Sequence, residues 1–330
     1  MKILQNKWKR NIENKELLTI SQTGMLKGIM ALGIVFYHLA VQYNENLIVL
    51  KPFKYLGFLF VGLFFFISGY GLTVSMLTKK DYFSSNKKRF LKVIIPFINA
   101  IIVYTIYYSL QGEILKQNIF FVVKYCWFIY EILALYIVFF ITYKKFSFKK
   151  ATILNSIIIL ISLILMYFLK ISATWYKSTF AFLMGIIVAK NREYLVKWFN
   201  SKYYIKALAL IVLMGICLSL GKYFNLEVLE IFIYNIAVML FIMVSLMIIK
   251  KLNKFENEFF KYLGKISFEI YLYHGLFIDL FKQIPINKNV GGMLIIIFSI
   301  IVAIIMNKFD KIIINKIFEL EKIKNVSNKI

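Results

Sequence analysis

The sequence places its two histidines and a few ionisable side chains inside long apolar stretches. Lys27 and His38 share the first stretch and are eleven residues apart, which is about three helical turns and about 16 Å, so both side chains point to one face. Polar groups at membrane depth are costly and are therefore candidates for function. A histidine can take a proton from a hydroxyl near neutral pH. His38 is therefore either a general base or a core histidine bonded to a neighbouring helix.

Further ionisable groups lie in two later apolar stretches. One of them carries Trp127 and Glu131, one helical turn apart. The other carries five polar or ionisable residues, which are Ser267, Glu269, Tyr271, His274 and Asp279. Because charged groups avoid lipid, we expect these side chains to face the interior of a helix bundle. They either take part in chemistry or form hydrogen bonds between helices.

The connection at residues 79–92 is rich in cations. Arg89 and Lys92 are three residues apart and lead straight into a helix, so they share a face at its start. Together with Lys88, such a pair can hold phosphate groups. The alternative interpretation is topological, because cations also fix a connection in the cytosol.

The stretch from Val61 to Leu72 contains three glycines and Ser68. Small residues allow helices to approach closely, or they allow a local break that lines a cavity. The serine does not lie in the Gly-x-Ser-x-Gly motif of a serine hydrolase. Close packing alone is the simpler interpretation.

Ten apolar segments carry these residues, and no soluble domain is evident. Hydrophobic residues make up 61% of the 330-residue chain, and runs of about 20 apolar residues can span a bilayer. The sequence therefore predicts an all-α polytopic membrane protein with one transmembrane domain over residues 25–313, a cytosolic N-terminal tail (1–24) and a cytosolic C-terminal tail (314–330). The predicted helices cover residues 25–43, 55–77, 93–110, 119–142, 151–169, 178–189, 203–221, 227–249, 266–281 and 290–307.

The charge pattern predicts the topology. The 41 Lys and Arg residues greatly outnumber the 16 Asp and Glu residues, and most of them lie in the two tails and in alternate connections. Cations hold loops in the cytosol, so the pattern predicts that both termini are cytosolic and that the helix count is even. The cations form no basic patch on a soluble fold, so a nucleic-acid partner is not expected. The polar N-terminus lacks the features of a cleavable signal peptide, and a short interfacial helix is expected around Trp8.

Cysteine and histidine usage argues against two kinds of site. Cys126 and Cys217 lie in apolar stretches and form no Cys-x-x-Cys motif, so neither a disulfide nor a cysteine-bound metal is expected. Two histidines leave little material for a metal site of any kind.

In order and spacing, these motifs resemble integral-membrane acyltransferase family 3 over nearly the whole chain. The family has an arginine, ten residues and then a histidine in its first helix, where this chain has Lys27 and His38. Its Phe-rich stretch ending in Ser-Gly-aromatic matches Phe64–Tyr70, and its Arg-x-x-Arg pair before a proline matches Arg89–Pro96. Its Trp-Phe helix start matches Trp127-Phe128, with Tyr136 downstream, and its aromatic stretch ending in glycine matches Phe180–Gly185. The most specific match is its final segment ending in histidine, which corresponds to Leu263–His274.

The chain departs from the family at two basic positions and one acidic position. Lysine replaces arginine at residues 27 and 92, and Gly24 replaces the acidic residue that precedes the first arginine. Lysine keeps the positive charge but lacks the bidentate fork of arginine.

The resemblance implies a reaction with a cytosolic acyl-CoA donor and a glycan hydroxyl as acceptor at the outer face. Lys88, Arg89 and Lys92 would hold the nucleotide phosphates, while Ser68, Tyr70, Trp127 and Tyr271 would line the donor path. His38 would act as general base or as transient acyl carrier, and Lys27 would orient the donor or stabilise negative charge. The partner of His38 would be one of three residues, which are Glu131, Tyr271 and His274.

The resemblance also implies the protein's surroundings. We expect a multi-pass protein of the inner or plasma membrane, with acyl-CoA as a co-substrate and no permanently bound cofactor. Related proteins often carry an appended esterase-like domain, and we expect none here, so transfer is direct or is completed by a separate extracytoplasmic protein. The abundance of Ile, Lys, Asn and Phe indicates an AT-rich bacterial genome, and for a bacterial protein we expect a cell-wall or secreted polysaccharide as acceptor.

Two other functions fit the same features. A transporter for a glycan or small metabolite would also carry intramembrane charges and glycines, although no inverted repeat is evident. A catalytically inactive membrane partner would fit the two lysine substitutions.

Overall fold

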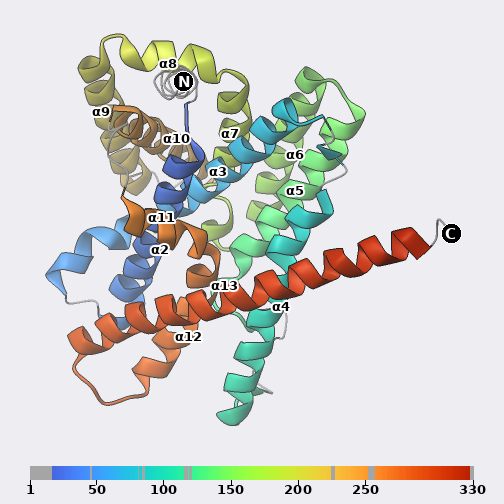
Figure 1. Ribbon diagram of the computed structural model, residues 1–330. Helices are drawn as coiled ribbons and strands as arrows, with labels where there is room; N and C mark the ends of the chain where they lie inside the picture. Colours follow the sequence, from blue (N-terminus) through green and yellow to red (C-terminus); the bar gives the residue numbers. More distant parts are fainter. Residues whose placement is uncertain are drawn as a thin grey trace, which may run out of the picture. The chain divides into compact units, whose positions relative to one another are not determined.

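The computed structural model consists of α-helices with a few short π- and 3-10-helical turns (Figure 1). It describes residues 17–44, 47–80, 82–83, 86–114, 118, 121–223, 227–251 and 257–327. Its α-helices are α2 (Ile20–His38), α3 (Gly57–Thr78), α4 (Asn86–Leu110), α5 (Trp127–Lys145), α6 (Phe148–Phe168), α7 (Phe180–Lys190), α8 (Arg192–Asn200), α9 (Tyr203–Tyr223), α10 (Glu227–Lys251), α11 (Glu258–Lys265), α12 (Ser267–Lys282) and α13 (Lys288–Ser327). The shorter turns are η1 (Leu39–Tyr43), η2 (Ile48–Tyr55) and η6 (Ala173–Trp175). The helix expected around Trp8 falls outside the described residues.

Each of the ten predicted apolar segments overlaps one of these α-helices. Within the described ranges, eight helices are long and apolar enough to cross a membrane. The helices at the sixth and ninth segments, α7 and α12, are shorter, with 11 and 16 residues. On α9 the side chains of Ile205, Leu208 and Val212 are exposed, which suits contact with lipid. The prediction of an all-α polytopic membrane protein is confirmed.

The largest departures from the predicted boundaries occur at three helix ends. Helix α4 begins at Asn86 and not at residue 93, so Pro96 lies well inside the helix instead of near its start. Helix α5 begins at Trp127 and not at residue 119. Helix α13 ends at Ser327 and not at residue 307.

The chain divides into two compact units that alternate along the sequence. The first unit comprises Met1–Met30, Leu56–Lys80 and Leu135–Gly264. The second unit comprises Ala31–Tyr55, Asp81–Ala134 and Lys265–Ile330. Helices α2 and α5 each begin in one unit and end in the other.

Glycines allow the closest helix packing in the first unit, where α3 contacts α7 and α10. A Cβ atom at Gly69 of α3 would overlap the carbonyl oxygen of Phe182 in α7, and one at Gly185 of α7 would overlap the carbonyl oxygen of Phe66. These glycines bring the two backbones together, as small residues do in membrane helix pairs. Close packing therefore explains Gly69 within the Val61–Leu72 stretch.

Gly69→Ala is expected to destabilise the protein by about 1–3 kcal/mol, the usual cost of forcing an extra methyl group into a packed interface. The matched control is Gly71→Ala, because Gly71 lies on the same helix, is exposed, and has no atom within 4 Å of the place that an added Cβ would take. Thermal unfolding of the two purified variants in detergent measures the difference. Equal melting temperatures would contradict the packing role.

In the second unit, α12 packs against α4, α13 and η1. Buried polar pairs join these helices. Asn307 Nδ2 donates to Glu269 Oε1 at 2.8 Å, and Asn99 Nδ2 donates to Asp310 Oδ1 at 2.5 Å. Both carboxylates are buried, and a buried carboxylate needs such partners because burial removes its water. Glu269 therefore has a structural role between α12 and α13.

Candidate functional site

His38 is the last residue of α2, where the helix continues as the π-helix η1. A π-turn of this kind is rare and occurs frequently at functional sites. The His38 side chain is half-buried. Its Nδ1 atom is fully buried and makes no hydrogen bond to any residue that the structure describes. The second unit thus presents an imidazole nitrogen with an unused hydrogen-bonding position.

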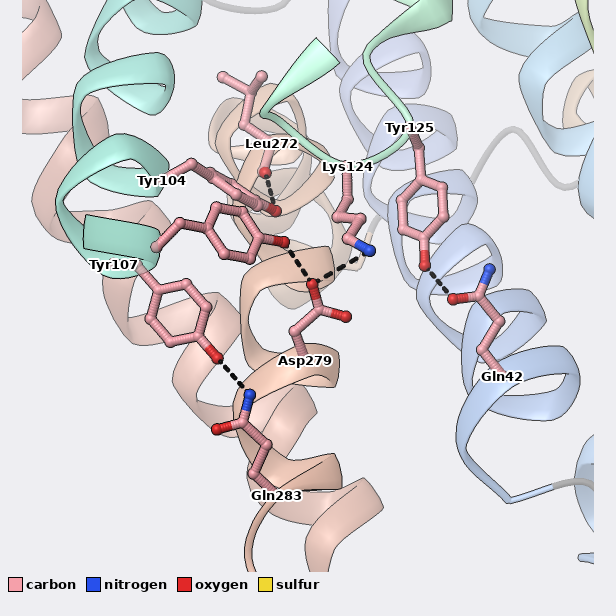
Figure 2. A network of polar contacts seen from close by, with 9 residues as sticks. Gln42, Tyr104, Tyr107, Lys124, Tyr125, Leu272, Asp279 and Gln283 are labelled. Carbon is pink, nitrogen blue, oxygen red and sulfur yellow. Dashed lines mark hydrogen bonds and ion pairs between the residues drawn. The ribbon is translucent and has the colours of Figure 1, made fainter. Parts of the chain in front are cut away.

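Tyr125 stacks on His38, with ring centroids 3.7 Å apart and an interplanar angle of 20°. Its φ angle is +60°, a left-handed conformation that costs a non-glycine residue about 1–3 kcal/mol. Two hydrogen bonds hold it there. The Tyr271 hydroxyl donates to the Tyr125 carbonyl oxygen. The Tyr125 hydroxyl donates to Gln42 Oε1, as Figure 2 shows. Strained residues that are held in this way cluster at functional sites.

The Tyr125 hydroxyl remains protonated over the ordinary pH range. Burial raises the pKa of Tyr125, and the nearby charge of Asp279 raises it further. The hydroxyl is therefore a hydrogen-bond donor, as its contact with Gln42 requires.

His274 completes the cluster from α12, and its side chain is fully buried. Its Nδ1 atom lies 2.7 Å from the Tyr271 carbonyl oxygen and 3.3 Å from that of Ile270. A carbonyl oxygen only accepts, so Nδ1 carries the proton and Nε2 is the acceptor. Nε2 is buried without a hydrogen-bond partner among the described residues. The ring centroid of His274 lies 5.1 Å from that of His38 and 5.3 Å from that of Tyr125.

Gly275 lets the segment before α5 approach α12 closely. A Cβ atom at this position would lie 2.5 Å from Lys124 Cβ, 3.0 Å from the Tyr104 hydroxyl and 3.1 Å from Tyr125 Cε2. The chain therefore has glycine directly after His274, at the point where Tyr125 must come near both histidines.

The arrangement is suited to proton transfer from a hydroxyl group. A neutral imidazole with an unused nitrogen can accept a proton near neutral pH, and two such rings lie side by side here. Within the described part of the chain, no group of three or more His, Cys, Asp or Glu side chains could hold a metal ion.

The predicted phosphate-binding cations lie at the start of α4, in the same unit. The Arg89 guanidinium lies 4.2 Å from the ring centroid of Tyr82. Its Nη1 atom is buried and makes no hydrogen bond to the residues described. Lys88 Nζ lies 5.4 Å from the ring centroid of Phe318, and Lys92 is exposed. A half-buried guanidinium with an unused donor is suited to an anionic ligand.

The other predicted site residues are distributed over both units. Tyr271 belongs to the cluster through its bond to Tyr125. Trp127 and Glu131 lie in the first two turns of α5, and the Glu131 side chain is buried. The remaining three belong to the first unit, and their roles stay predictions; they are Lys27, Ser68 and Tyr70.

The family model described as the acyltransferase domain of acyltransferase family 3 matches residues 24–308. No curated protein and no solved structure matches the chain significantly. The matched range covers most of the 330 residues, from the start of α2 to well inside α13, and includes both histidines. With its membrane-spanning helices and its paired histidines, the chain belongs to acyltransferase family 3.

Proposed function

We propose that this membrane acyltransferase moves an acetyl or other short acyl group from cytosolic acyl-CoA to a hydroxyl of a cell-surface or secreted glycan. The observation that supports the proposal best is the cluster of His38, Tyr125 and His274. His38 Nδ1 and His274 Nε2 are both buried without hydrogen-bond partners among the described residues. Buried polar atoms normally have partners, and exceptions call for a functional explanation. An acceptor hydroxyl would supply the missing partner.

In the proposed reaction, His38 takes the proton of the acceptor hydroxyl as that oxygen attacks the thioester carbonyl carbon. The new C–O bond forms and the C–S bond breaks. The CoA sulfur leaves with the bonding electron pair and receives the proton back from the His38 imidazolium, which gives a free thiol and an ester. In the alternative form of the reaction, His38 carries the acyl group briefly before the hydroxyl attacks.

Tyr125 and His274 would assist His38 without reacting themselves. The Tyr125 ring lies against the His38 ring at 3.7 Å and fixes its orientation. His274 is held in a single tautomer by the Tyr271 carbonyl oxygen, so its Nε2 atom is a permanent acceptor beside the base. Glu131 remains a proposed partner of His38.

The donor would enter at the start of α4. Lys88, Arg89 and Lys92 would bind its phosphates, and the positive-inside rule assigns this basic end to the cytosol. Residue 108 lies twenty positions further along α4 than residue 88, which is about 30 Å of helix, or one hydrocarbon thickness. The far end of α4 would therefore reach the outer face, where a glycan in the cell envelope is found. This topology fits a protein of the inner or plasma membrane.

Arg89→Ala is expected to raise the KM for acetyl-CoA about ten-fold or more while kcat changes little. A charge-assisted hydrogen bond is worth about 1.5–3 kcal/mol, and a phosphate contact made equally in the ground and transition states appears mainly in KM. The matched control is Lys87→Ala, because Lys87 is close in sequence but forms an ion pair with Glu321. An unchanged KM in the Arg89 variant would place the donor site elsewhere.

Turnover of acetyl-CoA by the purified protein in lipid nanodiscs tests the proposed function. Free CoA is measured as it forms, and an acetylated product is identified by mass spectrometry with an oligosaccharide present. We expect both CoA and ester to form. CoA release without ester would show that the acetyl group passes to water or stays on the protein, so a separate protein would have to supply transfer to the glycan. No release at all would favour a transporter or an inactive partner.

A further inference from the structure

Asp279 lies on α12 five residues after His274, in the same unit as the histidine cluster. One of its oxygens, Oδ2, accepts a hydrogen bond from the Tyr108 hydroxyl at 2.7 Å and lies 3.3 Å from Lys124 Nζ (Figure 2). The side chain is 18% exposed. The other oxygen, Oδ1, makes no hydrogen bond to the residues that the structure describes. The carboxylate thus has one oxygen fixed by the protein and one that a ligand can use.

Two pairs of amide and phenol groups are drawn with this carboxylate in one network of polar contacts (Figure 2). The Tyr125 hydroxyl donates to Gln42 Oε1, and Gln283 Nε2 donates to the Tyr107 hydroxyl at 3.3 Å. Both glutamine side chains are exposed. Each pair uses only part of its amide, which leaves two donors on Gln42 and an oxygen acceptor on Gln283. Carboxylate, amide donors and amide acceptors together match a molecule with several hydroxyl groups.

This polar group is continuous with the histidine cluster through consecutive residues. Lys124 bonds to Asp279, and Tyr125 both bonds to Gln42 and stacks on His38. The two-residue segment of Lys124 and Tyr125 therefore links Asp279 to the proposed base. Tyr107, Tyr108 and Gln283 also lie at the end of α4 and α12 that is remote from the basic start of α4. The positive-inside rule assigns this end to the outer face.

We propose that Asp279, Gln42 and Gln283 form the acceptor subsite, which binds neighbouring hydroxyl groups of a sugar and presents one of them to His38. The proposal rests on the proposed function, because it names where that reaction's acceptor binds. Asp279 accepts a charge-assisted hydrogen bond from a sugar hydroxyl through Oδ1. A site built to bond a substrate hydroxyl discriminates strongly against molecules without it, because its polar groups are otherwise left unpaired.

A structural role for Asp279 makes a different prediction. If the carboxylate only held Lys124, and through it the Tyr125 segment, then removing either partner of the ion pair would have the same effect. If Asp279 binds the acceptor, the loss of its charge weakens acceptor binding more than the loss of the Lys124 ammonium does. Lys124→Met is the matched control, because it removes the ion pair but keeps the carboxylate and its bond to Tyr108.

The test compares wild type, Asp279→Asn and Lys124→Met in nanodiscs, with acetyl-CoA as donor and chitotetraose or glycerol as hydroxyl-bearing probe. Asparagine keeps the size of the side chain and an oxygen for Tyr108. We expect Asp279→Asn to raise the KM for chitotetraose about ten-fold, with the KM for acetyl-CoA within about two-fold of wild type, and Lys124→Met to have a clearly smaller effect on the chitotetraose KM.

The possible failures are distinguishable. Equal effects of the two substitutions, or an unchanged chitotetraose KM in Asp279→Asn, would overturn the acceptor subsite. The subsite would also be overturned if wild type hydrolysed acetyl-CoA but modified neither probe. A wild-type protein that released no CoA from acetyl-CoA would instead overturn the proposed function.

Discussion

His38→Ala is expected to lower the rate of acyl transfer about 10²–10⁴-fold, the usual contribution of a general base. Acetyl-CoA binding should persist, because the proposed phosphate contacts are at the start of α4. The substitution removes no hydrogen bond through Nδ1, which has no partner among the described residues, so the fold should be retained. Single-turnover assays measure the transfer rate, and calorimetry with acetyl-CoA measures binding.

Two further variants separate the chemistry of His38 from local packing. His38→Gln keeps a polar side chain of similar size and should be as inactive as His38→Ala. Tyr37→Phe removes only a hydroxyl from the neighbouring ring, whose centroid lies 4.8 Å from that of His38, and should remain active. Near wild-type transfer by His38→Ala would exclude His38 as the base.

An experiment on the wild-type protein distinguishes the two proposed roles of His38. A transient acyl carrier would gain the mass of an acetyl group when the reaction is quenched early without acceptor, and the gain would map to the peptide containing His38. A general base would show no such adduct, and CoA would be released only when an acceptor hydroxyl, or water in its place, takes the acetyl group. Either result keeps His38 in the reaction, and they differ in the number of chemical steps.

The sequence predicts site residues well where an ionisable side chain lies inside an apolar helix, because its burial is costly. His38 and His274 are far apart in the chain, yet the sequence points to both, because an imidazole inside an apolar helix needs a compensating environment. The structure places their rings 5.1 Å apart. The same reasoning selects Tyr271, which contacts the cluster.

Helix ends are predicted less well, because hydropathy reports contact with lipid and not helical hydrogen bonding. Helix α4 extends toward the N-terminus through the charged residues 87–89, and α13 continues through charged residues to Ser327. At 1.5 Å per residue, the 40 residues of α13 extend about 60 Å, twice the hydrocarbon thickness. A charged turn can continue a helix beyond the bilayer without any apolar signal.

The sequence does not predict Tyr125 and Gln42 as site residues, and the reason is different. The apolar pattern predicts one helix over residues 119–142, whereas α5 begins only at Trp127, and Tyr125 adopts φ +60° before it. Nothing local in the sequence indicates that conformation, since a tyrosine is unfavourable in it. Its cause is tertiary, because the Tyr271 hydroxyl and Gln42 fix the residue from α12 and η1. The available signals are indirect, namely Lys124 inside an apolar run and Gly275 directly after His274.

Gly275→Ala is therefore expected to lower acyl transfer about 10²-fold, because a displacement of about 1 Å near a reacting group can cost that much. The new Cβ would lie 2.5 Å from Lys124 Cβ and 3.1 Å from Tyr125 Cε2, so the segment that carries Tyr125 must move away from the histidines. The transfer rate and the melting temperature in detergent are measured together. Gly292→Ala is the control, because Gly292 lies in the same unit and an added Cβ there would meet nothing within 4 Å.

A double-mutant cycle identifies the clash as the cause. Lys124→Gly removes the atom nearest the new methyl group, at the cost of the ion pair with Asp279. In that background Gly275→Ala should cost much less activity than in wild type, since contacting residues are coupled and independent ones are additive. If Gly275→Ala is equally harmful with glycine or lysine at residue 124, the displacement of Tyr125 does not explain the loss. The close approach at Gly275 would then serve packing alone, and the position of Tyr125 against His38 would need another cause.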